Sequence, residues 1–215
     1  MMATLKVAVV DYGAGNLRSV AKALARSGAE PHVTSDPEAV RGADAVALPG
    51  VGAFADAVRS LDAVGLSQVV REAIASGRPY LGLCLGLQLL FEESDEHGRT
   101  PGLGLFAGRV ARFPERDASG ARLRVPHIGW NEVRFAGRHP VLEALPAADY
   151  FYFVHAYRAV AADPGDVVGR ADYGGEFASA VARANVFAVQ FHPEKSQAAG
   201  QRLLDAWVAW AGACA

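Results

Sequence analysis

The chain has 215 residues, of which 51% are hydrophobic and 20% charged, a balance typical of a globular protein rather than a disordered or fibrous one. Its formal net charge of -2 provides no broad basic field, so we expect neither a nucleic-acid partner nor a membrane partner. Two cysteines, Cys84 and Cys214, cannot build a disulfide framework, and no Cys/His spacing predicts a metal site, so we expect a cytoplasmic protein without metal or cofactor.

Short apolar runs alternate with helical patterns in the first half of the chain. This alternation predicts a parallel sheet that is covered by helices on both faces. The expected strands are Lys6–Asp11, Pro31–Thr34, Ala45–Leu48 and Pro79–Leu83, and the expected helices are Leu17–Leu24, Phe54–Leu61, Leu66–Ser76 and Leu85–Phe91.

The second half is rich in strand-like runs, several of which we expect to pair antiparallel. A charged stretch from Pro114 to Arg124 indicates an exposed loop, and Ser196–Trp210 is expected to close the chain as a helix. We expect a single domain over residues 1–215, with a three-layer, doubly wound sheet that is mixed but mostly parallel. The expected strands are Leu105–Phe113, Glu132–Phe135, Tyr150–Val160, Val167–Tyr173, Phe177–Arg183 and Val186–Gln190, and the core side of the last helix is Leu203, Leu204, Trp207, Val208 and Ala211.

The strongest local signal is the segment GLCLGLQ, residues 82–88, where a buried strand is expected to turn into a helix. A cysteine between two glycines at such a turn is the pattern of a nucleophile elbow, in which Gly82 and Gly86 leave room and Cys84 projects from the sheet. The positive potential at the start of the following helix favours the reactive thiolate. The alternative is that Cys84 is a small buried residue of a hydrophobic segment.

A second signal lies at the end of the last expected strand, in the segment FHPE. Side chains two residues apart along an extended backbone point the same way, so we expect His192 and Glu194 on one side. A cysteine nucleophile needs a base, and that base needs a third group to orient it. The two signals together predict a triad of Cys84, His192 and Glu194, although His192 alone is equally typical of an ordinary core or surface histidine.

Two loops that contain glycine follow the first and third expected strands. Gly50, Val51 and Gly52 can turn backbone N–H groups toward a developing oxyanion, although a plain strand-to-helix turn has the same composition. The loop DYGAGNLR has Arg18 at the third glycine position of a dinucleotide fingerprint, so a nucleotide site is not predicted. Both loops fall at the carboxyl edge of the sheet, where α/β proteins bind their ligands.

Together these motifs resemble those of the class I (triad) glutamine amidotransferases, which have a flavodoxin-like fold. The resemblance runs from VVDYGAGNLRSV, through LPGVGAF, GLCLGLQLLFE, PHIGWN and YFVHAY, to VQFHPEKS. Within that family the order of motifs is similar to that of the glutaminase subunits of imidazole glycerol phosphate synthase. The resemblance implies hydrolysis of L-glutamine through a cysteine thioester, with ammonia passed to a (β/α)8-barrel cyclase subunit in a heterodimer. The cyclase makes imidazole glycerol phosphate and aminoimidazole carboxamide ribotide in histidine biosynthesis.

The resemblance also implies roles for individual residues. Cys84 corresponds to the nucleophile, His192 to the general base and then acid, and Glu194 to the group that orients it. Ala156 stands where the family commonly has serine, so any hydroxyl contact to glutamine is missing there. The other implied positions are Gly50, Val51, Gly52 and Leu85 at the oxyanion, Gly52, Gln88, Ala156 and Tyr157 at the glutamine, and Asn16, Trp130, Asn131, Tyr152 and Lys195 against the cyclase.

Three alternatives share parts of this pattern. Another glutaminase subunit, serving anthranilate, para-aminobenzoate, GMP or pyridoxal phosphate synthesis, would keep the triad and differ in its partner-facing loops. A catalytically silent scaffold on the same fold would have no need of all three triad residues. A stand-alone cysteine hydrolase acting on a peptide or γ-glutamyl bond would be fully active without a partner.

Overall fold

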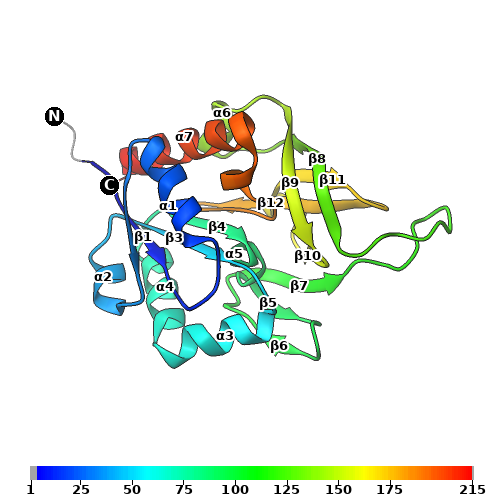
Figure 1. Cartoon of the computed structure of the whole chain (residues 1–215), viewed down its shortest axis with the longest axis horizontal. Helices are drawn as coiled ribbons and strands as arrows, with labels where there is room; N and C mark the ends of the chain where they lie inside the picture. The colour runs from blue at the N-terminus through cyan, green and yellow to red at the C-terminus, as the bar shows by residue number, and fades with distance from the viewer. Residues whose placement is uncertain (1–3, 215) are drawn as a thin grey trace.

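The structure is a computed structural model that describes residues 4–214. Five parallel strands form its centre (Figure 1). Four of them, β1, β3, β4 and β13, are rich in valine, leucine and alanine and almost wholly buried, as expected of strands covered on both faces, whereas the edge strand β2 is mostly exposed. Their order is β2-β1-β3-β4-β13, so the last strand of the chain pairs with β4. The bounds are β1 Lys6–Val10, β2 Glu30–Thr34, β3 Ala45–Gly50, β4 Tyr80–Cys84 and β13 Val186–Val189.

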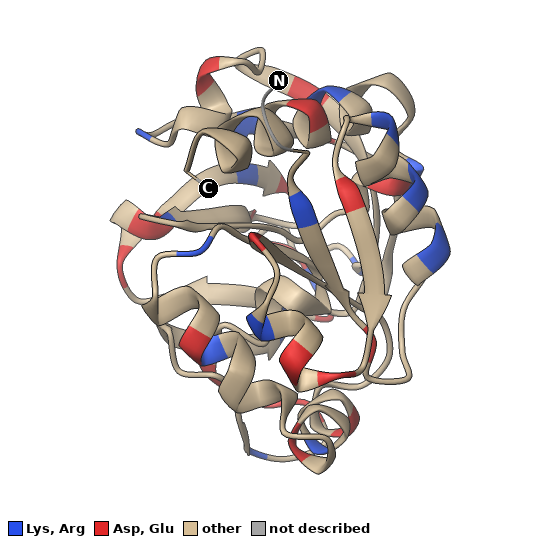
Figure 2. Cartoon of the chain, turned by 90° about the vertical axis from the view of Figure 1, so that its left-hand side faces the viewer, with Lys and Arg blue, Asp and Glu red and all other residues tan. Residues whose placement is uncertain are grey.

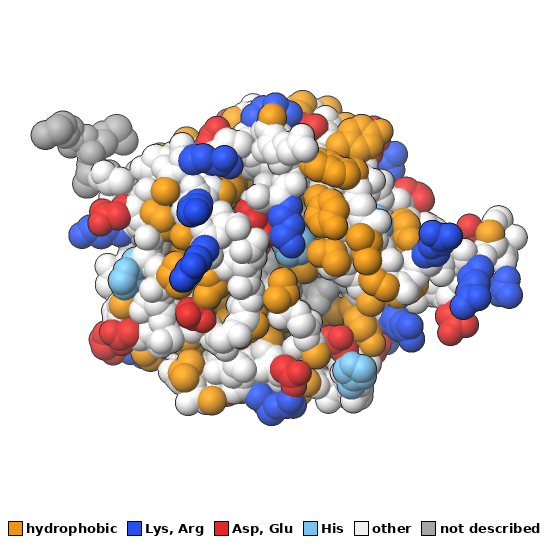
Figure 3. Space-filling view, in the orientation of Figure 1, with side chains coloured by type: hydrophobic (Ala, Val, Ile, Leu, Met, Phe, Trp, Pro, Cys, Tyr) orange, Lys and Arg blue, Asp and Glu red, His pale blue; other side chains and the backbone are white. Residues whose placement is uncertain are grey.

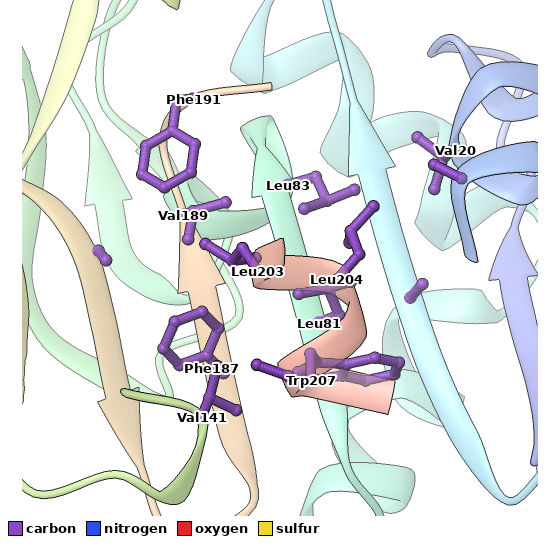
Figure 4. Packing of buried hydrophobic residues seen from close by; sticks show 14 of the residues in the cluster. Val20, Leu81, Leu83, Val141, Phe187, Val189, Phe191, Leu203, Leu204 and Trp207 are labelled. Atoms are coloured by element: carbon purple, nitrogen blue, oxygen red, sulfur yellow. The ribbon is translucent and has the colours of Figure 1, made fainter. Parts of the chain in front are cut away.

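Helices cover both faces of these strands. Alternate residues of a strand point to opposite faces of the sheet, so apolar side chains lie on both faces and each face is packed against helices. Leu81 and Leu83 of β4 lie in one hydrophobic cluster with the first and last helices, whereas Tyr80 lies in a second cluster with the helices between residues 37 and 75. Figure 4 shows Leu203 and Trp207 packed over β4 and β13. The predicted α/β architecture with a mostly parallel mixed sheet is confirmed. The helices are α1 Leu17–Arg26 and α7 Gln197–Cys214 on one face, and α2 Pro37–Arg41, α3 Phe54–Ala63 and α4 Leu66–Ala75 on the other.

Antiparallel pairing begins beyond β13 and extends the same sheet. The order continues β12-β10-β7-β5-β6, in which only the β7-β5 pair is parallel, while β11 pairs with both β12 and β8, and β8 pairs with β9. Two further short helices are α5 and α6. The bounds are β5 Phe91–Ser94, β6 Thr100–Pro101, β7 Phe106–Arg112, β8 His127–Phe135, β9 Ala148–His155, β10 Tyr157–Ala161, β11 Val167–Asp172, β12 Glu176–Arg183, α5 Leu85–Gln88 and α6 Pro140–Glu143.

Some expected elements differ from those observed. The helix expected over residues 85–91 ends at Gln88, because Phe91 begins β5 and its strand pairs with β7. The run expected as one strand over 150–160 divides at Ala156 into β9 and β10, and the strand expected from Glu132 begins at His127. The short helices α2 and α6 were not expected from the sequence. The core side predicted for the last helix is confirmed, since all five of its residues are buried.

The surface agrees with the low net charge. Acidic and basic residues are interspersed over the face shown in Figure 2. The loop from Pro114 to Arg124 is mostly exposed, as expected, and carries only an isolated bridge between Arg116 and Arg122. In the part of the chain that the structure describes, no helix is both long and apolar enough to cross a membrane.

Candidate active site

The predicted elbow is present at the carboxyl end of β4. Cys84 has φ 55° and ψ −104° and leads directly into α5, a left-handed conformation that costs a residue with a side chain about 1–3 kcal/mol. The two flanking glycines make room for this turn. A Cβ atom on Gly86 would lie 1.8 Å from the Leu48 carbonyl oxygen, and one on Gly82 would lie 2.7 Å from the Gly86 oxygen. The sequence pattern therefore encodes a strained turn that aims one thiol out of the sheet.

His192 and Glu194 follow β13, the strand next to β4. Nδ1 of His192 lies 2.9 Å from Oε1 of Glu194, and the two side chains are 4% and 2% exposed. The sequence correctly places these two side chains together, but the predicted extended backbone between them is wrong. The backbone is extended at His192 but then forms a 3-10 turn over Pro193–Lys195, and this turn brings the carboxylate back to the ring.

The other ring nitrogen of His192 faces the nucleophile. Nε2 is buried and makes no hydrogen bond to any atom of residues 4–214. Burial lowers the pKa of His192, but the neighbouring Cys84 sulfur and the Glu194 carboxylate outweigh burial and raise this pKa to about 9. The structure therefore brings the three predicted triad residues together, and the raised pKa of His192 favours the charged imidazolium beside the sulfur.

Cys84 opens onto a cavity of about 420 Å³, a volume suited to a small-molecule ligand. A larger cavity of about 670 Å³ lies against the arginine-rich loop and is lined by neither Cys84 nor His192. Within residues 4–214, no group of three or more His, Cys, Asp or Glu side chains is placed to hold a metal ion. The site cavity is lined by the predicted residues Val51, Gly52, Leu85, Gln88, Ala156, Tyr157 and Lys195, and by Glu96, Pro126, Val154 and His155, which were not predicted.

The predicted oxyanion loop lies directly across from the nucleophile. Gly50 ends β3 in register with Cys84, and a Cβ atom on it would lie 2.3 Å from the Tyr12 hydroxyl oxygen and 2.8 Å from Cβ of Leu85. The Tyr12 hydroxyl is buried and has no hydrogen-bond partner in the described part of the chain, and its pKa is raised by burial and by the Cys84 charge. Sequence reasoning missed Tyr12, although it lies in the glycine-containing loop after the first strand.

Two buried glutamines connect the cavity wall to the thiol. Nε2 of Gln88 donates to the Tyr157 carbonyl at 2.9 Å and to Oε1 of Gln190 at 3.0 Å. Nε2 of Gln190 lies 3.6 Å from the Cys84 sulfur and donates to it. Gln190 was not predicted as a site residue, and the available signal was its place immediately before the FHPE segment.

The five residues predicted to face a partner occupy different environments. Asn16 and Lys195 are exposed, and Lys195 also lines the site cavity. Trp130 is 47% exposed and makes an edge contact with the half-buried Tyr152 at 6.2 Å between ring centres. Asn131 differs, because it is half-buried and its amide donates to the Asp172 carbonyl of the neighbouring strand β11.

Strands β8 and β9 present an apolar face to solvent. Ile128, Trp130 and Tyr150 are 59%, 47% and 56% exposed, and Figure 3 shows hydrophobic side chains gathered over these strands. Exposed aromatic side chains grouped in this way are typical of a protein-binding surface. This face lies on the same hairpin as His155, which lines the site cavity.

Known proteins are similar to this chain over nearly its whole length. The family model "Glutamine amidotransferase class-I" matches residues 8–209. The imidazole glycerol phosphate synthase subunit HisH of Methylococcus capsulatus is 54% identical over 209 residues, which cover 95% of this chain and 96% of the relative. The HisH subunit of Pseudomonas putida is 48% identical over 208 residues, covering 96% and 98%. The solved structure of PurLQS from Thermotoga maritima covers 97% of this chain and 99% of its own, with a TM-score of 0.73 at 20% identity, and supports the fold alone.

Proposed function

The chain belongs to the class I glutamine amidotransferase family, and from that premise we propose its function. It is the glutaminase subunit of imidazole glycerol phosphate synthase, and it hydrolyses L-glutamine to glutamate and ammonia. The observation that carries this proposal is the buried hydrogen-bonded pair of His192 and Glu194 beside Cys84, whose thiol opens onto a cavity.

The reaction follows from the charges of the triad. The imidazolium of His192 favours the thiolate of Cys84, which adds to the side-chain carboxamide carbon of glutamine and forms a C–S bond. Nε2–H of His192 then protonates the departing nitrogen, and the C–N bond breaks. Ammonia departs, and the glutamyl group remains bound to Cys84 as a thioester. Water attacks the thioester while the now neutral His192 takes its proton, and cleavage of the C–S bond releases glutamate. Glu194 holds the ring through Nδ1 in both steps.

Backbone N–H groups stabilise the negative oxygen of each tetrahedral intermediate. We assign this role to the Leu85 N–H, which follows Cys84 at the elbow, and to the loop of Gly50, Val51 and Gly52. The close approach of the loop to the elbow requires glycine at position 50. Donors fixed in place before the reaction stabilise the developing charge without reorganisation, and removal of one such donor typically costs about 3 kcal/mol.

The cavity lining supplies partners for the two charged groups of glutamine. Glu96 is a carboxylate in the lining and uses one oxygen to accept the Phe54 N–H at 2.7 Å, so its second oxygen is available to the α-ammonium group. The Ala156 carbonyl already accepts the Phe113 N–H at 3.1 Å. The backbone N–H of Ala156 is therefore the group that this residue offers to the α-carboxylate of glutamine. A serine hydroxyl at this position is not required.

The ammonia passes to a cyclase subunit with which the chain forms a complex. Free ammonia in water at neutral pH mostly takes up a proton and loses its nucleophilicity, so a closed route to the second site is needed. We assign the docking surface to the apolar face of β8 and β9, with Trp130 and Tyr152, and to the neighbouring loops that carry Asn16 and Lys195. Asn131 supports this surface indirectly, because its amide ties β8 to the Asp172 carbonyl of β11.

We also propose that residues 1–215 act as a single glutamine amidotransferase domain in the cytoplasm. Strands from both halves of the chain join one sheet, which supports the first statement. The thiolate chemistry of Cys84 needs a reducing compartment, because an oxidised sulfur is no nucleophile, and this supports the second.

Glutamine hydrolysis measured with and without a barrel cyclase and its nucleotide ligand tests the proposal. We expect slow turnover of the chain alone and a strong rise with the cyclase. Cys84→Ala should abolish glutamine-dependent synthesis while ammonia-dependent synthesis by the complex continues, and Cys214→Ala, at an exposed free cysteine, should change neither. Full activity without any partner would favour the stand-alone hydrolase, and glutamine-dependent synthesis by Cys84→Ala would mean that the nucleophile is misassigned.

A further inference from the structure

Two buried histidines take no part in the proposed hydrolysis of glutamine. His127 on β8 and His155 on β9 are paired across the two strands and are 2% and 6% exposed. Nδ1 of His127 lies 3.0 Å from Nε2 of His155, and the His127 ring stacks on Phe153 and Tyr173 at 4.8 and 4.0 Å between ring centres. Because buried polar groups are hydrogen-bonded, the direction of each bond in this pair can be worked out.

Backbone carbonyl oxygens fix the protons, since a carbonyl oxygen can only accept. The Tyr157 oxygen lies 2.8 Å from Nδ1 of His155, so this nitrogen carries the proton. Nε2 of a neutral His155 must then accept from Nδ1–H of His127, which leaves Nε2 of His127 to accept from the Asn131 amide at 3.4 Å. That amide nitrogen also donates to the Asp172 carbonyl at 2.8 Å, which confirms its orientation.

The Tyr157 carbonyl joins this pair to the nucleophile. It also accepts from Nε2 of Gln88, whose second amide hydrogen is donated to Oε1 of Gln190. Gln190 must therefore present its own amide nitrogen to the Cys84 sulfur. We call this series the amide–imidazole relay, and its members are Asn131, His127, His155, the Tyr157 carbonyl, Gln88, Gln190 and Cys84.

We propose that the amide–imidazole relay is a positioning device for the glutaminase reaction, in which His127 and His155 hold Gln88 and Gln190 in the orientations that Cys84 and glutamine require. The proposal rests on the proposed function, because it concerns how that same site binds its substrate. Both amide hydrogens of Gln88 are committed within the relay. Its Oε1 is therefore the atom that can accept a hydrogen bond from the α-ammonium group of glutamine.

The relay works only while both imidazoles are uncharged. Protonation of His155 would set two N–H groups against each other at its contact with His127. Burial lowers the pKa of His127 to about 4. Burial, opposed by the Tyr157 carbonyl and helped by His127 and His192, lowers the pKa of His155 to about 3. Two neutral rings supply directed hydrogen bonds without a second cation that would compete with His192 for the thiolate.

Nitrogen-15 NMR of the whole chain tests the relay directly, since the shifts of the ring nitrogens report which one carries the proton. We expect His127 and His155 both in the Nδ1–H form, without titration between about pH 5 and 8. His139 is an internal control, because its Nδ1 accepts the Val141 N–H and its ring must have the opposite form. An Nε2–H form of either relay ring, or titration of either in that range, would overturn the proposal.

Steady-state kinetics of the chain bound to the cyclase test what the relay does. His155→Leu removes the donor to the Tyr157 carbonyl, whereas His155→Asn keeps an N–H near the position of Nδ1. We expect the KM for glutamine to rise roughly tenfold in His155→Leu, as the loss of one buried hydrogen bond implies, and to recover largely in His155→Asn. His139→Leu, at an equally buried histidine outside the site, should lower stability without changing KM. An unchanged KM in His155→Leu contradicts the relay.

Failure of the relay and failure of the proposed function give different results. If the unsubstituted chain hydrolyses no glutamine with the cyclase, the proposed function fails whatever the ring forms are. If the unsubstituted chain is active but His155→Leu keeps its KM, only the relay fails. If His155→Leu does not fold, the ring forms in the unsubstituted chain decide the question alone.

Discussion

Glu194→Gln measures how much the site depends on one buried charge. Oε1 of Glu194 lies 2.9 Å from Nδ1 of His192, so glutamine can keep the contact but not the charge. Burial lowers the pKa of His192, yet Cys84 and Glu194 raise it from 6.5 to about 9, which favours the imidazolium by about 3 kcal/mol. A hydrogen bond to a charged group is stronger than a neutral one by about 1–1.5 kcal/mol, so we expect kcat to fall roughly tenfold.

The same substitution should change how stability depends on pH. The folded-state pKa of His192 lies above the value of 6.5 for an unfolded chain, so protonation of His192 stabilises the folded protein. This stabilisation is fully present below pH 6.5 and is lost as the pH rises through about 9. This group therefore lowers the free energy of unfolding across that window by up to about 3 kcal/mol. In Glu194→Gln the pKa of His192 falls back toward 6.5, so the decline across the window should be shallower.

Urea unfolding at several pH values, together with glutamine turnover in the presence of the cyclase, measures both effects. Glu176→Gln is the matched control, because the side chain of Glu176 is 49% exposed and forms ion pairs with the exposed side chains of Arg134 and Arg170. Surface ion pairs contribute about 0–1 kcal/mol, so this variant should keep its turnover and its pH profile. Wild-type turnover in Glu194→Gln, with an unchanged pH profile of unfolding, would refute the reasoning.

Three other predictions follow from the elbow, the thiols and the docking surface. Gly86→Ala puts a Cβ atom 1.8 Å from the Leu48 oxygen, so we expect a loss of stability of about 1–3 kcal/mol, measured by thermal unfolding, and almost no glutaminase turnover; normal turnover would contradict the elbow. An electrophilic analogue of glutamine should label Cys84 well before the exposed Cys214, as peptide mapping after brief labelling would show; equal labelling would argue against an activated thiol. Trp130→Ala should weaken cyclase binding by about 2 kcal/mol in calorimetry while ammonia-dependent synthesis at saturating partner is unaffected; unchanged affinity would place the interface elsewhere.

The elbow and the triad could be predicted because their signals are local. Gly82, Cys84 and Gly86 lie within five residues, and the required close contacts come from neighbouring parallel strands whose buried runs are also legible in the sequence. His192 and Glu194 are two residues apart, so almost any compact backbone keeps them close. The prediction was right about the contact and wrong about the backbone that makes it, since a 3-10 turn replaces the extended strand.

The rest depended on pairings between distant segments. His127 and His155 are 28 residues apart and meet only because β8 and β9 pair in one register, and a lone histidine has no local pattern that announces this. The apolar run after Gln88 has the composition of a helix, yet Phe91 enters β5 because β7 offers it a strand partner. Tertiary context overrides local preference in such short segments.

The 3-10 turn that carries Glu194 is attached to β9, a strand of the proposed docking surface, by a closed set of hydrogen bonds. The His192 N–H donates to the Tyr152 carbonyl at 2.9 Å, the Tyr152 N–H donates to Oγ of Ser196 at 3.0 Å, and that hydroxyl donates to the His192 carbonyl at 2.6 Å. Strand β9 thus holds His192, the proposed base, through its backbone, while the Tyr152 side chain lies half-buried beside the exposed Trp130. A cyclase that packs on the proposed docking surface would act on the strand that positions this histidine. This shared strand gives a physical reason why glutamine hydrolysis should depend on the partner that consumes the ammonia.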